Sequence, residues 1–416
     1  MNLKNLKDHL VALSEQLAPY QQIWDREILG VYPEGLASYN EAWLTDLARL
    51  SHDQLWQLEA RESYPSLPAG ELRDLLKLLH SLTQLKTISI TPQKPLPSWA
   101  FFHVKEKKKH EIEVLMGELS SLKERLDFKH IIDIGAGQGH LSRILSHYLG
   151  LSVSCIEQNP ELIELGLKRQ DKYPLPDGGR TFDFLNLQIN GLSSLTDRIG
   201  LLSPDSFLLG LHTCGPLAVY QLQSLLHSKA RGALNFACCY GKMTDQKTMN
   251  LTGLIPFELS PFALTLASRS HARLSYQDFC FKERVKLYRY GLHLYCHEFR
   301  PELGFVSVGN SGFKDYYAPF AHYLKSKLPG KISADEGEIQ AWFLRPRIQD
   351  QLRKMFLANI VRWQFGRALE CLILVDRALY LKENGLEVEL AEYFEEGLSP
   401  RNIGLLAYRC SPTRAD

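Results

Sequence analysis

The chain has 416 residues, which is long enough to bury a large core and to form two or three domains. Its 48 basic and 47 acidic residues almost cancel, so net charge alone does not make it a nucleic-acid binder, although a local basic face remains possible. Eight irregularly spaced cysteines and a start without an apolar run predict reduced thiols and a cytoplasmic protein. No stretch approaches the roughly 18 uninterrupted apolar residues of a membrane helix, so we expect no membrane partner.

Residues 1–98 predict a helical amino-terminal domain, because their apolar residues recur at helical spacing. Pro92, Pro95 and Pro97 then predict a linker. After the linker, a basic stretch opens an amphipathic helix that should lie beside the motif that follows. This stretch is either a solvated charged face or, through Lys109, a contact to the carboxylate of a bound cofactor or to a substrate phosphate.

Residues 131–139 are the most informative segment and read Ile-Ile-Asp-Ile-Gly-Ala-Gly-Gln-Gly. An apolar strand runs here into a loop with glycine at alternate positions, Gly135, Gly137 and Gly139. Such a loop can turn tightly and let a ligand approach the backbone where a side chain would clash. Apolar residues at helical spacing follow the loop. The segment therefore predicts a strand, a turn and a helix that together cradle a nucleotide-type cofactor.

A second strand, Leu151–Ile156, ends at Glu157, whose carboxylate can accept hydrogen bonds from both hydroxyls of a ribose. Dinucleotide enzymes favour G-x-G-x-x-G, whereas this chain has D-x-G-x-G-x-G. Asp133 at the head of this pattern would repel a pyrophosphate but would tolerate a cofactor that bears an ammonium group. The pattern resembles motif I of the class I S-adenosylmethionine methyltransferases. The alternative is a glycine-rich turn in an unrelated α/β protein.

Three further strands are predicted, Phe182–Leu187, Ser206–Leu211 and Leu234–Ala237. Asn186 or Asn190, after the first of them, could face the adenine of the cofactor. Ligands of an open parallel sheet gather outside the carboxyl ends of its strands. We therefore expect the residues that follow the other two strands to lie close to the transferred methyl group. These residues are His212, Cys214, Cys238, Cys239 and Tyr240.

Each of these residues has a chemical and a structural interpretation. His212 could contact the cofactor and act as a general base for a hydroxyl or nitrogen nucleophile, or it could cap the turn. Cys214 could attack C6 of a pyrimidine, although a thiol beside a cofactor is more often packing. Tyr240 is the third catalytic candidate, besides His212 and Cys214. His212 and the three cysteines could close a zinc site, but their spacings are shorter than those of common zinc modules, so we expect no metal.

Residues 99–242 are predicted to form the first part of this sheet domain, and residues 243–345 an inserted domain that binds substrate. Basic and aromatic residues interleave in the insertion, a mixture that suits phosphate pairing with base stacking but is also typical of a partly buried amphipathic helix. The mixture comprises Lys282, Arg284, Lys286, Arg289, Arg300, Tyr288, Tyr290, Tyr295 and Phe299. Residues 346–416 should return to the sheet through one long helix, Leu352–Leu381, and a closing antiparallel hairpin.

Several segments from about residue 100 onwards resemble the family of methyltransferase-like protein 25 and the ribosomal RNA adenine dimethylase domain-containing protein. The segments are Lys108–Glu111, Asp133–Ser142, His212–Leu217, Cys238–Tyr240, Asp376–Arg377 and Ser399–Asn402. The histidine and cysteine pairs are more distantly similar to the acceptor-stem tRNA ribose 2′-O-methyltransferases. The resemblance implies a class I, Rossmann-like α/β fold with a seven-stranded sheet and S-adenosylmethionine as cofactor.

The leading hypothesis is therefore an S-adenosylmethionine-dependent methyltransferase that acts on RNA. Enzymes that methylate exocyclic amines usually carry N-P-P-Y or D-P-P-Y after the fourth strand, and this chain has His212-Thr213-Cys214-Gly215 there, so N6-adenine methylation is disfavoured. Two alternatives stay open. The substrate could be a protein, or the chain could be a scaffold that binds the cofactor without turnover.

Overall fold

The computed structural model describes most of the chain. The described ranges are 2–31, 36–60, 66–89, 95–173, 175–197, 201–269, 274–309 and 311–410. Pro92 of the predicted linker lies outside them. The chain divides into two compact units. Unit 1 comprises Met1–Ala18, Leu82–Ala272 and Arg367–Asp416, and unit 2 comprises Pro19–Ser81 and Arg273–Gly366.

These ranges differ from the domain boundaries expected at residues 98, 242 and 345. The amino-terminal segment from Pro19 onwards and most of the predicted insertion share unit 2, because α16 (Pro346–Gln364) packs against α2 (Gln21–Trp24), α3 (Glu41–Ala48), α4 (His52–Glu59) and α12 (Tyr276–Phe299). Residues 243–272 belong instead to unit 1. The physical reason is packing between segments that lie far apart in the chain. Local sequence patterns do not predict which distant segments pack together.

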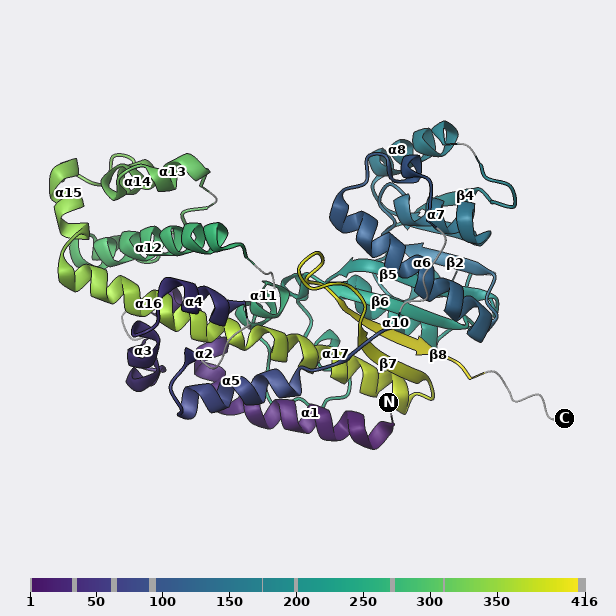
Figure 1. Ribbon diagram of the computed structural model, residues 1–416, viewed down its shortest axis with the longest axis horizontal. Coiled ribbons are helices and arrows are strands. Elements are labelled where there is room, and N and C mark those ends of the chain that lie inside the picture. Colours follow the sequence, from purple (N-terminus) through teal and green to yellow (C-terminus); the bar gives the residue numbers. More distant parts are fainter. Residues whose placement is uncertain are drawn as a thin grey trace. The chain divides into compact units, whose positions relative to one another are not determined.

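Unit 1 is built on one eight-stranded sheet (Figure 1). Its order is β1-β7-β8-β6-β5-β2-β3-β4. The strands are β1 (Lys86–Thr87), β2 (His130–Ile134), β3 (Ser152–Glu157), β4 (Phe182–Asn186), β5 (Ser206–Cys214), β6 (Gly232–Cys238), β7 (Glu387–Glu392) and β8 (Ile403–Tyr408). The predicted Rossmann-like α/β fold is confirmed, and the two-residue strand β1 adds an eighth strand beside β7.

The strands β4, β3, β2, β5 and β6 are parallel neighbours in that order, and β8 pairs antiparallel with both β6 and β7. The closing antiparallel hairpin is therefore confirmed. Since parallel neighbours end at the same edge of a sheet, the loops after β2, β3, β5 and β6 open onto one region. This edge carries the candidate site.

Helices cover both faces of the sheet. On one face, α6 (Glu106–Leu126) and α7 (His140–Leu149) pack their apolar residues against strand residues such as Ile131, Phe207 and Phe236. Side chains alternate between the faces along a strand, so Asn235 points to the other face. There its Nδ2 donates to Oε1 of Gln221 in α10 (Pro216–Leu226) over 2.7 Å.

Unit 1 contains five further α-helices among its described residues. They are α1 (Leu3–Leu17), α8 (Pro160–Lys172), α9 (Ser193–Thr196), α11 (Pro261–Arg269) and α17 (Gly366–Glu383). The single long helix predicted over 352–381 is wrong, because the chain forms α16 and α17 with a turn at Phe365 between them.

Unit 2 is helical throughout its described residues (Figure 1). Besides α16 it contains α2 (Gln21–Trp24), α3 (Glu41–Ala48), α4 (His52–Glu59), α5 (Glu71–Leu82), α12 (Tyr276–Phe299), α13 (Phe313–Tyr317), α14 (Phe320–Lys327) and α15 (Glu336–Phe343). The core between these helices is rich in aromatic rings. Phe320 stacks on Phe343 at 4.1 Å between ring centroids, and Tyr288 packs edge-on against both.

Much of the basic and aromatic mixture on α12 serves this core. Tyr290 and Tyr295 are buried, and Lys282 pairs with Glu59 while lying over the ring of Trp363. Lys286 is half-buried, and burial lowers its pKa to about 8. The partly buried amphipathic helix, one of the two interpretations of the sequence, describes these residues, and of the predicted cations only Arg284 is exposed.

Candidate functional site

A cavity of about 520 Å³ lies at the carboxyl ends of β2, β3 and β5, in the size range of small-molecule and cofactor sites. Its wall combines a glycine, a carboxylate, an imidazole, a thiol and an ammonium group with apolar side chains. The lining residues are Gly135, Ile156, Glu157, Gln158, Leu187, Ile189, Asn190, His212, Cys214, Pro216, Leu217, Tyr220 and Lys242.

The glycine loop between β2 and α7 makes the tight turn that the sequence predicts, and glycine is required for different reasons at Gly137 and at Gly139. All three glycines have a positive φ, +73° at Gly135, +59° at Gly137 and +68° at Gly139. At Gly139 a Cβ would also come within 2.9 Å of the rings of Phe182 and Phe184. At Gly137 a Cβ would meet nothing within 4 Å, so backbone conformation and open space for a ligand are what require glycine there.

Glu157 joins the end of β3 to the glycine loop. Its Oε2 accepts from the backbone N–H of Gly137 over 2.9 Å. Its Oε1 accepts from the backbone N–H groups of Gln158 and Asn159, each over 2.9 Å. The carboxylate lines the cavity and is held by three donors, so it is well placed to bind the ribose hydroxyls of a nucleotide-type cofactor.

Asp133 does not line the cavity. Its side chain is only 3% exposed, and its Oδ2 accepts from Oγ of Ser142 in α7 over 2.5 Å. Burial raises the pKa of Asp133 to about 6, although the hydrogen bond from Ser142 acts in the opposite direction. The structure therefore places this acid behind the loop, where it ties β2 to α7.

Of the other predicted cofactor contacts, Gly137, Gly139, Asn186 and Lys109 are also not among the residues that line the cavity. Nδ2 of Asn186 donates to the backbone oxygen of Gln158 over 3.2 Å, so it supports the chain beside Glu157. Of the two asparagines considered for the adenine, Asn190 is the one that lines the cavity. Lys109 lies over the ring of Phe101, with 5.6 Å from Nζ to the ring centroid.

His212 is held by a buried carboxylate that sequence reasoning missed as its partner. It lies at a register shift in β5 with φ of +65°, and its Nε2 is 2.8 Å from Oε1 of Glu111. Oγ of Ser399 donates to the same oxygen over 2.7 Å, and Nζ of Lys108 lies 3.2 Å from Oε2. The side chain of Glu111 is fully buried.

The charge on Glu111 determines which ring nitrogen of His212 carries the proton. Burial raises the pKa of the carboxyl, but the hydrogen bond and charge of His212, with Lys108 and Ser399, outweigh burial and lower the pKa to about 2. An ionised carboxylate only accepts, so the Nε2–H of His212 donates to it. In the neutral ring Nδ1 is then left as the proton acceptor.

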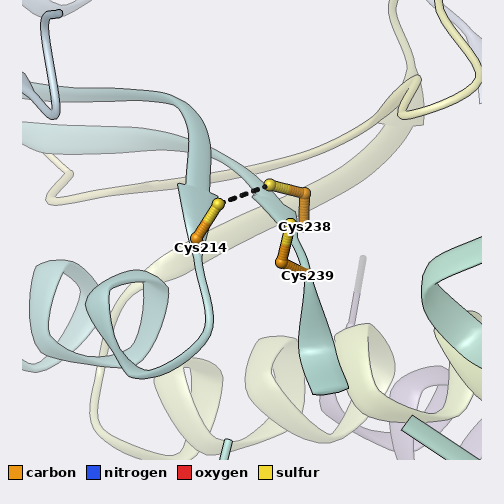
Figure 2. A group of neighbouring side chains, drawn as sticks. All are labelled: Cys214, Cys238 and Cys239. Atoms are coloured by element: carbon orange, nitrogen blue, oxygen red, sulfur yellow. Dashed lines mark hydrogen bonds between the residues drawn. The ribbon is translucent and has the colours of Figure 1, made fainter. Parts of the chain in front are cut away.

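Three thiols meet beside His212 at the ends of β5 and β6 (Figure 2). Sγ of Cys214 lies 3.3 Å from Sγ of Cys238, and these two and Sγ of Cys239 all lie within 4.8 Å of one another. The hydrogen bond from Cys238 lowers the pKa of Cys214, with a smaller effect from Lys242 in the same direction. All eight cysteines of the chain are free thiols.

Tyr240, the third catalytic candidate, is 1% exposed and does not line the cavity. Burial raises its pKa, and the guanidinium of Arg377 lies 5.6 Å from the centroid of its ring. The structure thus brings His212 and Cys214 to the cavity and leaves Tyr240 beneath it.

Sequence reasoning missed Glu111, Ser399, Tyr220 and Lys242. Glu111 and Ser399 belong to segments that carried the family resemblance, Lys108–Glu111 and Ser399–Asn402, so a signal was present without a role. Because they lie 101 and 187 positions from His212 in the chain, no local spacing could pair them with it. Tyr220 and Lys242 carry no motif signal.

A family model described as "Methyltransferase domain" matches residues 107–246, which include the glycine loop, Glu157, His212 and the three cysteines. This segment is a methyltransferase domain. Its cofactor is S-adenosylmethionine, and the site fits that molecule, since the Glu157 carboxylate faces a cavity of suitable size beside the open space at Gly137.

Three solved structures overlap loosely with the chain. The plantazolicin methyltransferase BpumL with S-adenosylhomocysteine has 12% identity and a TM-score of 0.26, covering 86% of this chain and 98% of its own. The same enzyme with a desmethylplantazolicin analogue has 14% identity and a TM-score of 0.24, covering 70% and 92%. Coclaurine N-methyltransferase, bound to N-methylheliamine, has 12% identity and a TM-score of 0.24, covering 89% and 100%. At these scores the overlaps carry no argument about the substrate of the methyltransferase domain.

Among the described residues, no helix combines the length and the apolar character that crossing a membrane requires. The cytoplasmic location expected from the cysteines stays a prediction.

Proposed function

We propose that this methyltransferase transfers the methyl group of S-adenosylmethionine to a hydroxyl or a ring nitrogen of an RNA. The observation that carries the proposal is the His212–Glu111 pair on the wall of the cofactor cavity. A base of this kind is needed only when the acceptor loses a proton as it is methylated. When bound, S-adenosylmethionine supplies an electrophilic methyl group.

The residues of the chain would orient the acceptor and take its proton. Glu111 is fixed by Ser399 and Lys108, and it holds the Nε2–H of His212. Nδ1 of His212 takes the proton of the acceptor, and the buried carboxylate stabilises the imidazolium that results. Orientation by the cavity wall provides the rest of the rate enhancement, since methyl transfer requires the acceptor in line with the leaving sulfur.

RNA as the substrate class is supported by the resemblance to the methyltransferase-like protein 25 family and by an aromatic surface on unit 2. Phe313 and Tyr317 are 69% and 66% exposed. Both stack on Phe281, with 4.6 and 5.8 Å between ring centroids, and the guanidinium of Arg284 lies 5.3 Å from the centroid of Tyr317. Exposed rings beside an arginine are typical of surfaces on which bases stack.

A protein substrate is the second candidate. It is favoured by the partial burial of Lys282 and Lys286 and by the pairing of Lys282 with Glu59, which make these two cations less available to phosphates. The two candidates differ in their response to salt, because only binding to RNA releases condensed counterions and so weakens steeply as salt rises.

The test is transfer of a radiolabelled methyl group into fractionated RNA and protein from cells that lack this enzyme. We expect label in the RNA fraction. Glu111→Gln should lower this label at least about tenfold. The double substitution Phe313→Ala and Tyr317→Ala should lower it by one to two powers of ten. Glu113→Gln, at an exposed position on the same helix, serves as the matched control. Label confined to protein would replace RNA by the second candidate. Cofactor binding without label in either fraction would leave a scaffold or a small-molecule acceptor.

A further inference from the structure

The thiols of Cys214, Cys238 and Cys239 converge although their positions in the chain argue against it. Cys238 and Cys239 are consecutive, and consecutive residues of a strand point to opposite faces of the sheet. Here Cys239 adopts a left-handed conformation with φ of +50° directly after β6, which interrupts the alternation. Cys214 is the register partner of Cys238 across the β5–β6 pair. Figure 2 shows the three side chains gathered at these strand ends.

Backbone strain points to the same place. Only four non-glycine residues of the described chain have a positive φ, and two of them lie here: Cys239 belongs to the cluster, and His212 lies two residues before Cys214. Such conformations cost about 1–3 kcal/mol each and gather at functional sites. The left-handed backbone at Cys239 turns its thiol towards those of Cys214 and Cys238. This answers the objection that the spacings between these residues are too short for a metal site.

We propose that Cys214, Cys238 and Cys239 bind one Zn²⁺ ion through three thiolates and leave its fourth coordination position open. With a Zn–S distance of about 2.3 Å, two thiolates on a tetrahedral zinc lie roughly 3.8 Å apart. The measured separation of 3.3 Å for Cys214 and Cys238, with all three sulfurs within 4.8 Å, needs only small side-chain adjustments to reach that geometry.

The open position follows from the absence of a fourth protein ligand. Within the described part of the chain, no further histidine, cysteine or acidic side chain joins the group. The nearby His212 is not a member of this group, and its Nε2 is 2.8 Å from Oε1 of Glu111. Structural zinc sites are closed by four protein ligands, whereas three ligands and an open position are typical of catalytic sites. Because Cys214 lines the cofactor cavity, the ion would lie at its wall, where a water or an acceptor atom could complete the coordination.

The charge balance also suits a cation. Zinc binding requires the thiols to lose their protons, and three thiolates on Zn²⁺ leave one net negative charge. The ammonium group of Lys242, on the same cavity wall, would offset it. The proposal does not depend on RNA being the acceptor.

The experiment measures zinc and cobalt binding by the full-length protein. We expect one equivalent of zinc after purification, and with Co²⁺ a thiolate-to-metal charge-transfer band. Each of Cys214→Ser, Cys238→Ser and Cys239→Ser should weaken zinc binding by at least about tenfold in chelator competition, because even partners outside the first coordination sphere cost 10- to 100-fold. Cys410→Ser, at an exposed cysteine, should leave binding unchanged.

Alkylation of the unmodified protein keeps the test decisive if the serine variants fail to fold. Zinc should protect Cys214, Cys238 and Cys239 from iodoacetamide, as mapped by mass spectrometry, and leave Cys410 reactive. The proposal is overturned if the protein carries no zinc and gives no cobalt band, if the variants hold as much zinc as the unmodified chain, or if Cys214 and Cys238 are recovered as a disulfide.

Discussion

The two halves of the sheet edge are built in different ways. The cofactor half, at the ends of β2 and β3, is shaped by backbone: three glycines with positive φ and one carboxylate, Glu157, held by three N–H groups. The acceptor half, at the ends of β5 and β6, is shaped by side chains from distant segments, with His212 held by Glu111 and Ser399 and with three thiols in contact.

The two halves differ most in the pKa of a buried carboxyl group, one in each half. Asp133 in the cofactor half has a pKa raised to about 6, because burial is offset only in part by Ser142. Glu111 in the acceptor half has a pKa lowered to about 2, because His212, Lys108 and Ser399 more than offset its burial. The cofactor half thus relies on backbone N–H groups and on contacts local to the loop, whereas a proton-transfer site needs a charge that the fold keeps ionised.

The largest expected effect is in the cofactor half. Gly137→Val should abolish binding of S-adenosylmethionine in calorimetry, because a β-branched residue is forced out of φ +59° and its side chain enters the ligand's space. Gly385→Val is the matched control, since Gly385 also has a positive φ, +84°, and nothing within 4 Å of its Cβ position. Both variants should lose similar stability, about 1–3 kcal/mol. Unchanged cofactor affinity in Gly137→Val would refute the cradle.

The next effect belongs to the acceptor half. Glu111→Gln should lower the rate of methyl transfer by about 10²–10⁴-fold, because a neutral amide neither fixes the proton on Nε2 of His212 nor stabilises the imidazolium. The dissociation constant of S-adenosylmethionine should change less than twofold. Steady-state kinetics of the variant beside Glu113→Gln provide the measurement, and an equal loss of cofactor affinity and rate would mean that Glu111 is only structural.

The lowered pKa of Glu111 also predicts an acid-sensitive stability. The folded-state pKa of about 2 lies below the ordinary value of 4.5, so the stabilisation is present above pH 4.5 and is lost as pH falls towards 2. At about 1.4 kcal/mol for each pKa unit, the contribution is roughly 3 kcal/mol. Denaturant midpoints of the unmodified chain should therefore fall more steeply below pH 4.5 than those of Glu111→Gln. Parallel pH profiles would contradict the assigned charge.

The same contrast explains what could be predicted from sequence. The cofactor half is contiguous, so spacing alone predicted a role for Gly135, Gly137, Gly139 and Glu157, of which Gly135 and Glu157 line the cavity. The alternation of strands and helices predicted the sheet, which is confirmed. The two-residue strand β1 is too short to leave a periodic signal. The pairing of His212 with Glu111 depends on how α6 lies against β5, which no local pattern encodes.

In unit 2 as well, sequence patterns did not predict which side chains are buried by distant segments. For the aromatic residues of α12 the sequence left a stacking surface and a partly buried helix open. Tyr290 and Tyr295 are buried by packing within unit 2, whereas Phe299 at the end of α12 is exposed, as are Phe313 and Tyr317 of the separate short helix α13. Periodicity identified an amphipathic helix without showing which face is covered. The same holds for Asn186 and Asn190, where only the course of the loop decides which side chain reaches the cavity.

The smallest effect is expected at Asp133, with a pH dependence opposite in sign to that of Glu111. Its folded-state pKa of about 6 lies above the ordinary 3.8, so its contribution to stability is fully present below pH 3.8 and is lost as pH rises to about 6. Asp133→Asn, which keeps an oxygen for Ser142, should therefore be more stable than the unmodified chain above pH 6, by on the order of 2–3 kcal/mol, and similar to it near pH 4. Asp183→Asn, at an exposed position of β4, is the control. Because Asp133 lies behind the loop and not on the cavity wall, cofactor affinity should change no more than a few-fold. A large loss of affinity at unchanged stability would instead make Asp133 a direct ligand of the cofactor beside Glu157, and the cofactor half would then depend on two charged side chains.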